Sequence, residues 1–346
     1  GGGGRFPTVA MCLAVALSRA VKHTGGMAGI GDLVPTIDIS ADVDAQMPAL
    51  DAACREHGFF LLSGHGLDDV IERTWDVARR FFASDRHVKQ AVERNADNPL
   101  GWFDRELTKR KRDTKEVFDF IDPSVAKVDA FNRWPADAGN FRSTLAEFYD
   151  AFSDLSTRAV EVVHLALGLE PAEGSKFGGD RVNSSVRLNH YPVGDPVPED
   201  ERGGLEALGE TALGYHTDPG VLTLLLQDDT GGLQAQGRDG RWIDVPPTAG
   251  TVVVNLADSV QVWTNDRYRA AIHRVAPMTQ RDRMSIPYFL HPSRDAIVEP
   301  LAELSTGGAL YRPFSWREYM RARTDDNFTD LGVDDAQITD YLIAAG

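Results

Sequence analysis

Cysteine and long apolar runs are scarce in this 346-residue chain. Two cysteines, Cys12 and Cys54, are too few for a disulfide framework or a thiolate metal site. They indicate a reducing compartment, and we therefore predict a cytoplasmic location. No apolar stretch reaches the roughly 18 residues that a membrane-spanning helix needs, so no membrane partner is expected.

Positive charge is also in short supply. The chain has 36 basic and 52 acidic residues, a formal net charge of −16. Such a surface repels the phosphates of nucleic acids, so nucleic acid is not expected as a partner. One dense basic run, Lys109–Arg112, has acidic residues on both sides. We interpret this run as a solvated helix face.

The first 26 residues differ in character from the rest. They open with four glycines and contain a short apolar run, Val9–Leu17, which is similar to the core of a signal peptide. A single positive charge, Arg5, precedes this run, and no clear cleavage site follows it. We interpret residues 1–30 as a disordered or extraneous extension with Met27 as the candidate start. A secretion signal is the alternative.

The spacing of apolar residues changes near Arg181. Before it, a strand is expected at Val34–Ile39, another at Phe59–Leu62, and helices at 44–57, 70–82 and 141–167. This pattern predicts an N-terminal α/β region over 31–180 that packs on a core over 181–346, in one integrated catalytic unit.

The core region has a period near two up to about Ile297. Short apolar runs separated by Gly, Pro and Asn/Asp clusters predict a closed or sandwiched β structure. These runs are 221–226, 242–245, 252–254, 271–275 and 286–290. Helices are expected at Trp316–Arg323 and Asp335–Ala344. The acidic, glycine-containing segment Pro198–Glu210 is predicted to be either a mobile lid or a plain connector.

A metal site is the first chemical hypothesis. His216 and Asp218 are two residues apart, so in a strand both side chains point to one face. This spacing alone is weak evidence, because a chain of this composition contains such a pair by chance. His273 lies in the apolar stretch 271–275, where a hydrogen-bonded core histidine is the alternative to a ligand.

A buried anion site is the second hypothesis. Arg283 and Ser285 are also two apart, in an otherwise apolar strand where an arginine is costly without an anion. The guanidinium fork suits a carboxylate, and the serine adds a donor. Arg187, Asn189 and Tyr191 share one face of another predicted strand. Two histidines and one carboxylate form the facial triad typical of non-haem iron(II), which leaves coordination positions open.

These motifs resemble one family. The stretches GYHTDPGVLTLLLQDDTGG, NLADSVQVWTNDRYRAAIHRVAP and RDRMSIPYFLHP look like the core of the isopenicillin N synthase-like, 2-oxoglutarate- and Fe(II)-dependent oxygenases. VPTIDIS and HGFFLLSGHGL look like that family's leading region. The resemblance covers about Leu33–Tyr319 and implies a mainly β fold with flanking helices around a double-stranded β-helix (jelly-roll) core.

The resemblance also implies roles for single residues. By match of position, the iron ligands are His216, Asp218 and His273, while Arg283 and Ser285 hold the distal carboxylate of 2-oxoglutarate. Further contacts to this cosubstrate are expected from Tyr191 and Asn189. The implied reaction uses Fe(II), 2-oxoglutarate and dioxygen to hydroxylate, desaturate or cyclise a small-molecule substrate. A monomer is expected.

Substrate contacts are predicted less sharply. The candidates are Arg187, Arg105, Phe118, Phe120 and Phe289, and further aromatic candidates are Trp102, Phe103, Phe314 and Tyr319. Each aromatic residue could equally belong to the core. An inward arginine needs an anion, so Arg187 and Arg105 suggest a substrate with a carboxylate.

Three alternatives stay open. A zinc hydrolase could also use two histidines and an acid, but the chain has no His-Glu-x-x-His motif, and a hydrolase has no use for the Arg283 anion site. A non-catalytic jelly-roll module would be expected to have lost a ligand. An oxidase of the same family that needs no 2-oxoglutarate, like isopenicillin N synthase, can keep the Arg-x-Ser pair.

Overall fold

The computed structural model describes residues 34–95, 97–136, 139–169, 177–324 and 336–343. The predicted extension over 1–30 lies outside these ranges. Within them, no helix is both long and apolar enough to cross a membrane.

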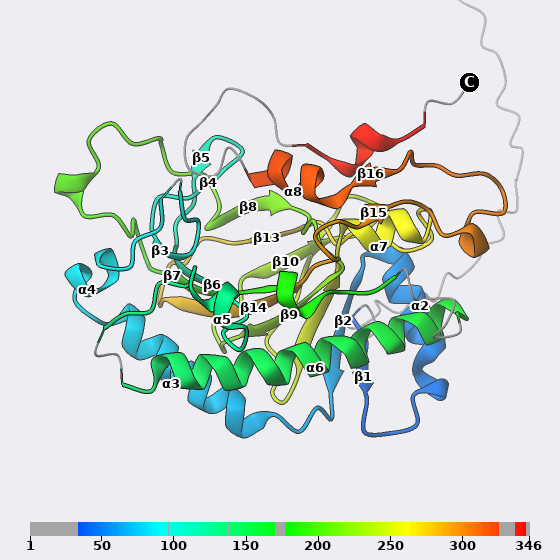
Figure 1. Cartoon of the computed structure of the whole chain (residues 1–346), viewed down its shortest axis with the longest axis horizontal. Coiled ribbons are helices and arrows are strands. Elements are labelled where there is room, and N and C mark those ends of the chain that lie inside the picture. The colour runs from blue at the N-terminus through cyan, green and yellow to red at the C-terminus, as the bar shows by residue number, and fades with distance from the viewer. Residues whose placement is uncertain (1–33, 96, 137–138, 170–176, 325–335, 344–346) are drawn as a thin grey trace, which may run out of the picture.

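Two sheets form the centre of the molecule (Figure 1). The larger has eight strands in the order β1-β2-β12-β9-β14-β7-β6-β3, and the smaller has four in the order β11-β10-β13-β8. The bounds in the larger sheet are β1 Thr36–Asp38, β2 Phe59–Ser63, β12 Val252–Leu256, β9 Leu222–Gln227, β14 Arg283–Leu290, β7 Ser185–Tyr191, β6 Glu116–Ile121 and β3 Gly101–Phe103. Those in the smaller sheet are β11 Trp242–Asp244, β10 Leu233–Gln236, β13 His273–Val275 and β8 Leu213–His216.

Alternation along the strands of the larger sheet separates a helix-facing side from a side that carries polar groups. On β9, Leu222, Leu224 and Leu226 belong to the main hydrophobic cluster together with α6 (Phe141–Leu167). Thr223, between them, points to the opposite face. β14 alternates likewise, so Arg283 and Ser285 face away from the helices. The predicted polar face is thus built by the period-two pattern itself.

Helices cover the apolar side of the larger sheet. Figure 1 shows α6 and α3 (Asp68–Phe82) running side by side along it, and α2 (Met47–Glu56) also contacts α6. Helix α6 has the predicted bounds and ends at Gly168, whose φ of 73° gives a left-handed cap. Cys54 is buried in this core.

Smaller elements complete the fold. They are the short helices α4 (Arg86–Gln90), α5 (Ala126–Asp129) and α7 (Asp258–Trp263), helix α8 (Trp316–Thr324), and the strand pair β15 (Ile297–Val298) and β16 (Phe314–Ser315). Single 3-10 turns lie at η1 (Asp44–Gln46), η3 (Arg181–Asn183), η4 (Glu199–Glu201), η5 (Ala302–Leu304) and η6 (Ile338–Tyr341).

Two sequence-based expectations are wrong. The basic run Lys109–Arg112 is not a helix face: it closes a hairpin between β4 (Leu107–Thr108) and β5 (Lys111–Arg112). Lys109 and Arg110 have φ of 50° and 61°, the left-handed values that a tight hairpin turn requires. The helix expected at 335–344 is, over its described residues, only the single turn η6, because Leu342 instead bridges to Tyr311.

The two predicted regions share one sheet. Strands β1, β2, β3 and β6 come from the N-terminal region and extend the sheet formed by the core. The acidic segment 198–210 contacts the rest of the protein near both of its ends. Glu201 forms an ion pair with Arg86, and the Ala207 carbonyl accepts a hydrogen bond from the Arg112 backbone N–H. The segment contributes no residue to the cavities described below.

Candidate active site

Three predicted metal ligands meet between the two sheets. His216 ends β8 and lies directly opposite His273 on the neighbouring β13, while Asp218 follows two residues after His216. The Asp218 Oδ1 atom is 3.6 Å from His216 Nε2 and 3.9 Å from His273 Nε2. One ligand atom from each residue lies within 4.8 Å of the others. The side chains therefore surround a space that suits one metal ion.

Hydrogen bonds orient each of these side chains. The Nδ1 atoms of His216 and His273 lie 2.8 and 2.9 Å from the carbonyl oxygens of Gly214 and Ala271. Nδ1 must donate to these carbonyls, so each Nε2 presents its lone pair to the shared space. On Asp218, Oδ2 accepts from Thr223 Oγ1 at 2.5 Å and from Asn255 Nδ2 at 2.8 Å, which leaves Oδ1 for a metal.

Electrostatics favours the protonation states that metal binding needs. Burial and the neighbouring His216 ring lower the pKa of His273 to about 4, so its imidazole is neutral at pH 7. Burial alone would raise the pKa of Asp218, but the neighbouring rings of His273 and His216 and a hydrogen bond from Thr223 outweigh it and hold that pKa far below its ordinary value. Two imidazoles and one carboxylate fit Fe(II).

Removal of the Thr223 hydroxyl should weaken metal binding. Thr223→Val keeps the shape of the side chain but deprives Asp218 Oδ2 of a donor, and losses of this kind cost about 10- to 100-fold in metal affinity. Anaerobic titration with Fe(II) measures the change. Thr74→Val is a matched control, since Thr74 is also buried but bonds to Val70 in helix α3. Equal affinities of the Thr223 variant and wild type would contradict this role.

A narrow cavity of about 80 Å³ connects the ligands with Arg283. Arg283 is 1% exposed, and its Nη2 has a long contact of 3.5 Å to Gln227 Oε1. Within the described part of the chain, its buried Nε and Nη1 groups have no hydrogen-bond acceptor. A buried guanidinium with unsatisfied donors at the end of a cavity is a site for an anion.

Strand register assembles the other predicted anion-site residues. On β14 and β7, Arg283 is paired with Tyr191 and Ser285 with Asn189. The Asn189 side-chain amide donates to Ser285 Oγ at 3.3 Å, and the Arg283 guanidinium lies 4.9 Å from the centre of the Tyr191 ring. The structure therefore brings the four residues together around one cavity.

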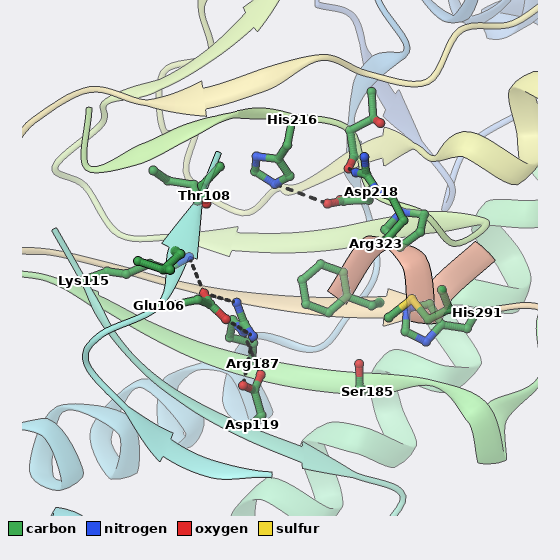
Figure 2. A pocket seen from close by; sticks show the side chains of 16 residues that line it. Glu106, Thr108, Lys115, Asp119, Ser185, Arg187, His216, Asp218, His291 and Arg323 are labelled. Atoms are coloured by element: carbon green, nitrogen blue, oxygen red, sulfur yellow. Dashed lines mark hydrogen bonds and ion pairs between the residues drawn. The ribbon is translucent and has the colours of Figure 1, made fainter. Parts of the chain in front are cut away.

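A second cavity, of about 200 Å³, also reaches His216 and Asp218 (Figure 2). We call it the inner cavity. His216 and Asp218 lie at one end of this cavity. Its wall also includes Phe289 in strand β14, His291 directly after that strand, and Met320 and Arg323 in helix α8. Figure 2 shows a group of charged side chains on the left of this cavity and His291 on the right.

We call these charged residues the charged cluster. Glu106 accepts hydrogen bonds from Arg94, Arg187 and Lys115, and Asp119 accepts from Arg94 and Arg187. Burial alone would raise the pKa of Glu106, but the surrounding cations hold it well below its ordinary value. Lys115 also pairs with Asp113 at 3.1 Å. Three cations and three carboxylates therefore balance: Arg94, Lys115, Arg187, Glu106, Asp113 and Asp119.

Comparison with known proteins decides the family. A homoarginine-6-hydroxylase (2-ODD-233) of Oryza sativa subsp. japonica is 32% identical over 312 residues, which cover 85% of this chain and 93% of the relative. Residues 182–292 match the model of the 2OG-Fe(II) oxygenase superfamily. The chain belongs to this superfamily. Residues 34–137 also match a model described as non-haem dioxygenase in morphine synthesis N-terminal.

Further similarities agree with this 2OG-Fe(II) oxygenase assignment. Gibberellin 20 oxidase 2 of Oryza sativa subsp. indica is 32% identical over an alignment that covers 86% of this chain and 79% of that relative. The crystal structure of JOX2 in complex with 2OG, Fe and JA superimposes with a TM-score of 0.75 at 26% identity, covering 90% of this chain and 89% of that one. The jelly-roll prediction is confirmed. The protein is an oxidoreductase that uses Fe(II), 2-oxoglutarate and dioxygen on a small-molecule substrate.

The predicted substrate residues of this oxygenase fall into two groups. Arg187 and Phe289 line the inner cavity. Phe118 and Phe120 do not, because on β6 they alternate with Asp119 and point into the hydrophobic core against Phe81 and Tyr149. They are not proposed as substrate contacts.

The remaining candidates also lie outside the inner cavity. Arg105 pairs with Glu93 and Asp104, so its anions come from the protein. The aromatic candidates Trp102, Phe103, Phe314 and Tyr319 are buried, and Tyr319 donates to Asp258.

Sequence reasoning missed several residues that line the inner cavity. Asp119 carries a detectable signal, because a charged side chain interrupts the apolar strand β6. Glu106 gives no such signal, since its partner Arg187 is 81 residues away and the contact depends on the fold. The missed cavity residues include Glu106, Lys115, Asp119, His291, Met320 and Arg323.

Proposed function

We propose that His216, Asp218 and His273 hold the catalytic iron and that Arg283 and Ser285 bind the distal carboxylate of 2-oxoglutarate. One observation carries the second assignment: the buried Nε and Nη1 groups of Arg283 lack a protein acceptor within the described residues and face the cavity that the three ligands also line. A carboxylate supplies the acceptors that a planar guanidinium fork needs. Tyr191 and Asn189 complete this end of the cavity as further cosubstrate contacts.

The residues of the chain position the reaction. When bound, iron(II) would activate dioxygen, which is the oxidant: oxidation of 2-oxoglutarate to succinate and carbon dioxide supplies two of the four electrons that dioxygen takes up, and oxidation of the substrate C–H bond supplies the other two. Hydrogen bonds fix the orientation of the His216 and His273 rings and of Asp218. Apolar walls formed by Leu213 and Phe289 limit access of water to the ligands.

The inner cavity is poorly suited to bind a strongly charged group of the substrate. The protein itself satisfies both arginines of this cavity: Arg187 donates to Glu106 and Asp119, and Arg323 donates to the carbonyls of Thr217 and Ala336. Neither arginine therefore requires a substrate carboxylate. Relatives include homoarginine hydroxylases, and homoarginine carries a guanidinium. Here Glu106 and Asp119 already accept from Arg94 and Arg187, which disfavours a guanidinium at this place. We propose that a neutral, partly apolar portion of the substrate lies against Phe289 and Met320.

Dependence on 2-oxoglutarate is tested without knowledge of the substrate. We expect the iron-loaded protein to consume oxygen slowly and to form succinate when 2-oxoglutarate is added, and to do neither without it. An oxygen electrode combined with succinate analysis measures both. Oxygen consumption that is unaffected by 2-oxoglutarate would support the alternative, a 2-oxoglutarate-independent oxidase of the isopenicillin N synthase type.

Several broader expectations remain predictions. We propose a monomeric, cytoplasmic enzyme without a nucleic-acid partner. The scarcity of cysteine and the net charge of −16 support the second and third of these statements. Size-exclusion chromatography with light scattering tests the first.

A further inference from the structure

A buried histidine, His291, lines the inner cavity on the side opposite the charged cluster (Figure 2). It directly follows strand β14 and is 5% exposed. The same residue lines a larger neighbouring space of about 550 Å³, so it lies where the two spaces meet. Neither the metal site nor the anion site at Arg283 uses this side chain.

Neighbouring rings and a glycine hold the His291 ring in place. Its plane lies within 13° of the Phe289 ring plane, with ring centroids 6.2 Å apart, and the Trp316 ring lies 5.1 Å away. A Cβ atom on Gly220 would be only 2.7 Å from His291 Cδ2, so the turn after Asp218 has room for this ring because residue 220 is a glycine. The imidazole is therefore fixed beside the segment that carries a metal ligand.

One hydrogen bond sets the tautomer of His291. Its Nδ1 atom is 3.0 Å from the Asn183 carbonyl oxygen, to which it must donate. Burial lowers the pKa of His291, so the ring is neutral at pH 7 and carries no second proton. Nε2 is therefore a hydrogen-bond acceptor. Among the residues that the structure describes, none donates a hydrogen bond to it.

The charged side chains of the inner cavity, by contrast, are already paired. Glu106, Lys115, Asp119 and Arg187 belong to the charged cluster, and Arg323 donates to two backbone carbonyls. A free acceptor in such a cavity favours a ligand that brings a donor, because a ligand without one displaces water from Nε2 and leaves it unpaired. The cavity thus selects for a neutral donor.

We propose that His291 is a specificity residue whose Nε2 accepts a hydrogen bond from the substrate. This inference rests on the proposed function and adds a substrate class to it: a neutral molecule with an O–H or N–H group next to an apolar body. The donor lies where the inner cavity meets the larger space, and the apolar body lies against Phe289 and Met320. The carbon to be oxidised lies near His216 and Asp218.

NMR of the ring nitrogens tests the tautomer directly. The full chain carries ¹⁵N-labelled histidine and is loaded with 2-oxoglutarate and with Zn(II), which is diamagnetic and supports no turnover. The signals of His291 are identified by their loss in His291→Gln. At pH 7 their couplings to the carbon-bound ring protons should show a proton on Nδ1 and none on Nε2. A proton on Nε2 would overturn the proposal.

Pairs of fragments that differ in a single donor test the selectivity. The probes are phenol and anisole, benzyl alcohol and its methyl ether, and indole and 1-methylindole. Titrations of the same Zn(II)- and 2-oxoglutarate-loaded protein measure their affinities. Because the net contribution of a neutral hydrogen bond is modest, we expect at least one donor to bind about three- to tenfold more tightly than its methylated partner. The same donor should shift the Nε2 resonance of His291.

Substitutions assign this preference to one side chain. His291→Phe keeps an aromatic ring but removes the acceptor, so affinity for the donor should fall to that for its methylated partner. Unchanged affinity for the methylated partner shows that the cavity is intact. His291→Gln offers a side-chain carbonyl near the position of Nε2 and should restore part of the preference. His87→Gln is the control, because His87 is exposed on helix α4 and does not line the cavity.

Two binding results would also contradict the proposal. In one, the wild-type chain prefers none of the three donors over its methylated partner. In the other, the preference persists in His291→Phe. Neither result affects 2-oxoglutarate-dependent oxygen consumption, which is measured separately without substrate. Failure of this inference is therefore distinguishable from failure of the proposed function.

Discussion

Replacement of Arg283 by Lys should raise the KM for 2-oxoglutarate about 30- to 100-fold. The variant keeps a positive charge but loses the two parallel N–H donors that a carboxylate accepts. A charge-assisted hydrogen bond contributes about 1.5–3 kcal/mol, and about 1.4 kcal/mol corresponds to a factor of ten in affinity. Succinate formation at varied 2-oxoglutarate concentrations measures the effect.

The control for this prediction lies two residues away. Arg281 is exposed and pairs with Asp229, so Arg281→Lys should leave the KM for 2-oxoglutarate unchanged. Fe(II) affinity of Arg283→Lys should also remain close to that of wild type, because Arg283 holds none of the metal ligands in place through a direct hydrogen bond. A parallel loss of iron binding and 2-oxoglutarate binding would instead indicate that Arg283 is structural.

Replacement of Glu106 by Gln should reduce the free energy of unfolding by about 3–5 kcal/mol, the usual cost of leaving buried charges unpaired. Glu106 is 4% exposed and accepts hydrogen bonds from Arg94, Arg187 and Lys115. The neutral amide cannot balance these cations. Denaturant unfolding measures the loss, with Glu210→Gln, at an exposed position, as control. A loss below about 1 kcal/mol, typical of exposed pairs, would contradict the importance of the charged cluster.

The same carboxylate makes stability depend on acid pH. Because the pKa of Glu106 is depressed in the folded protein, its stabilisation is fully present above the ordinary value of 4.5 and is lost as pH falls through the folded value. The Gln variant lacks this contribution. Its unfolding free energy should therefore approach that of wild type as the pH falls below 4.5.

Local patterns in the sequence predicted much of the fold. The bounds of α6 followed from an apolar stripe of helical period and a glycine, and the strands of the core followed from apolar runs between turn residues. Predictions failed where distant contacts or turn geometry decide the structure. The run Lys109–Arg112 has charges that suit a helix, but its pairing with Leu107–Thr108 makes it a hairpin.

The candidate site was predictable to a similar extent. Two-residue spacing placed His216 with Asp218 and Arg283 with Ser285, because side chains alternate along a strand. The same rule, applied to β6, would have assigned Phe118 and Phe120 to the face opposite Asp119. The partners of Arg187 could not be inferred, since Glu106 and Asp119 come from other strands or loops far away in the sequence.

Iron stoichiometry tests the central claim most directly. Equilibrium dialysis against Fe(II) under anaerobic conditions, followed by metal analysis, should give one iron per chain for wild type and for the control variant His291→Ala. His291 is a suitable control because it is buried and lines the inner cavity but does not belong to the His-Asp-His group. His273→Ala and Asp218→Ala should retain little or no iron while remaining folded by circular dichroism. Full iron occupancy in His273→Ala, or loss of iron in a folded His291→Ala, would contradict the assignment of His216, Asp218 and His273 as the ligands.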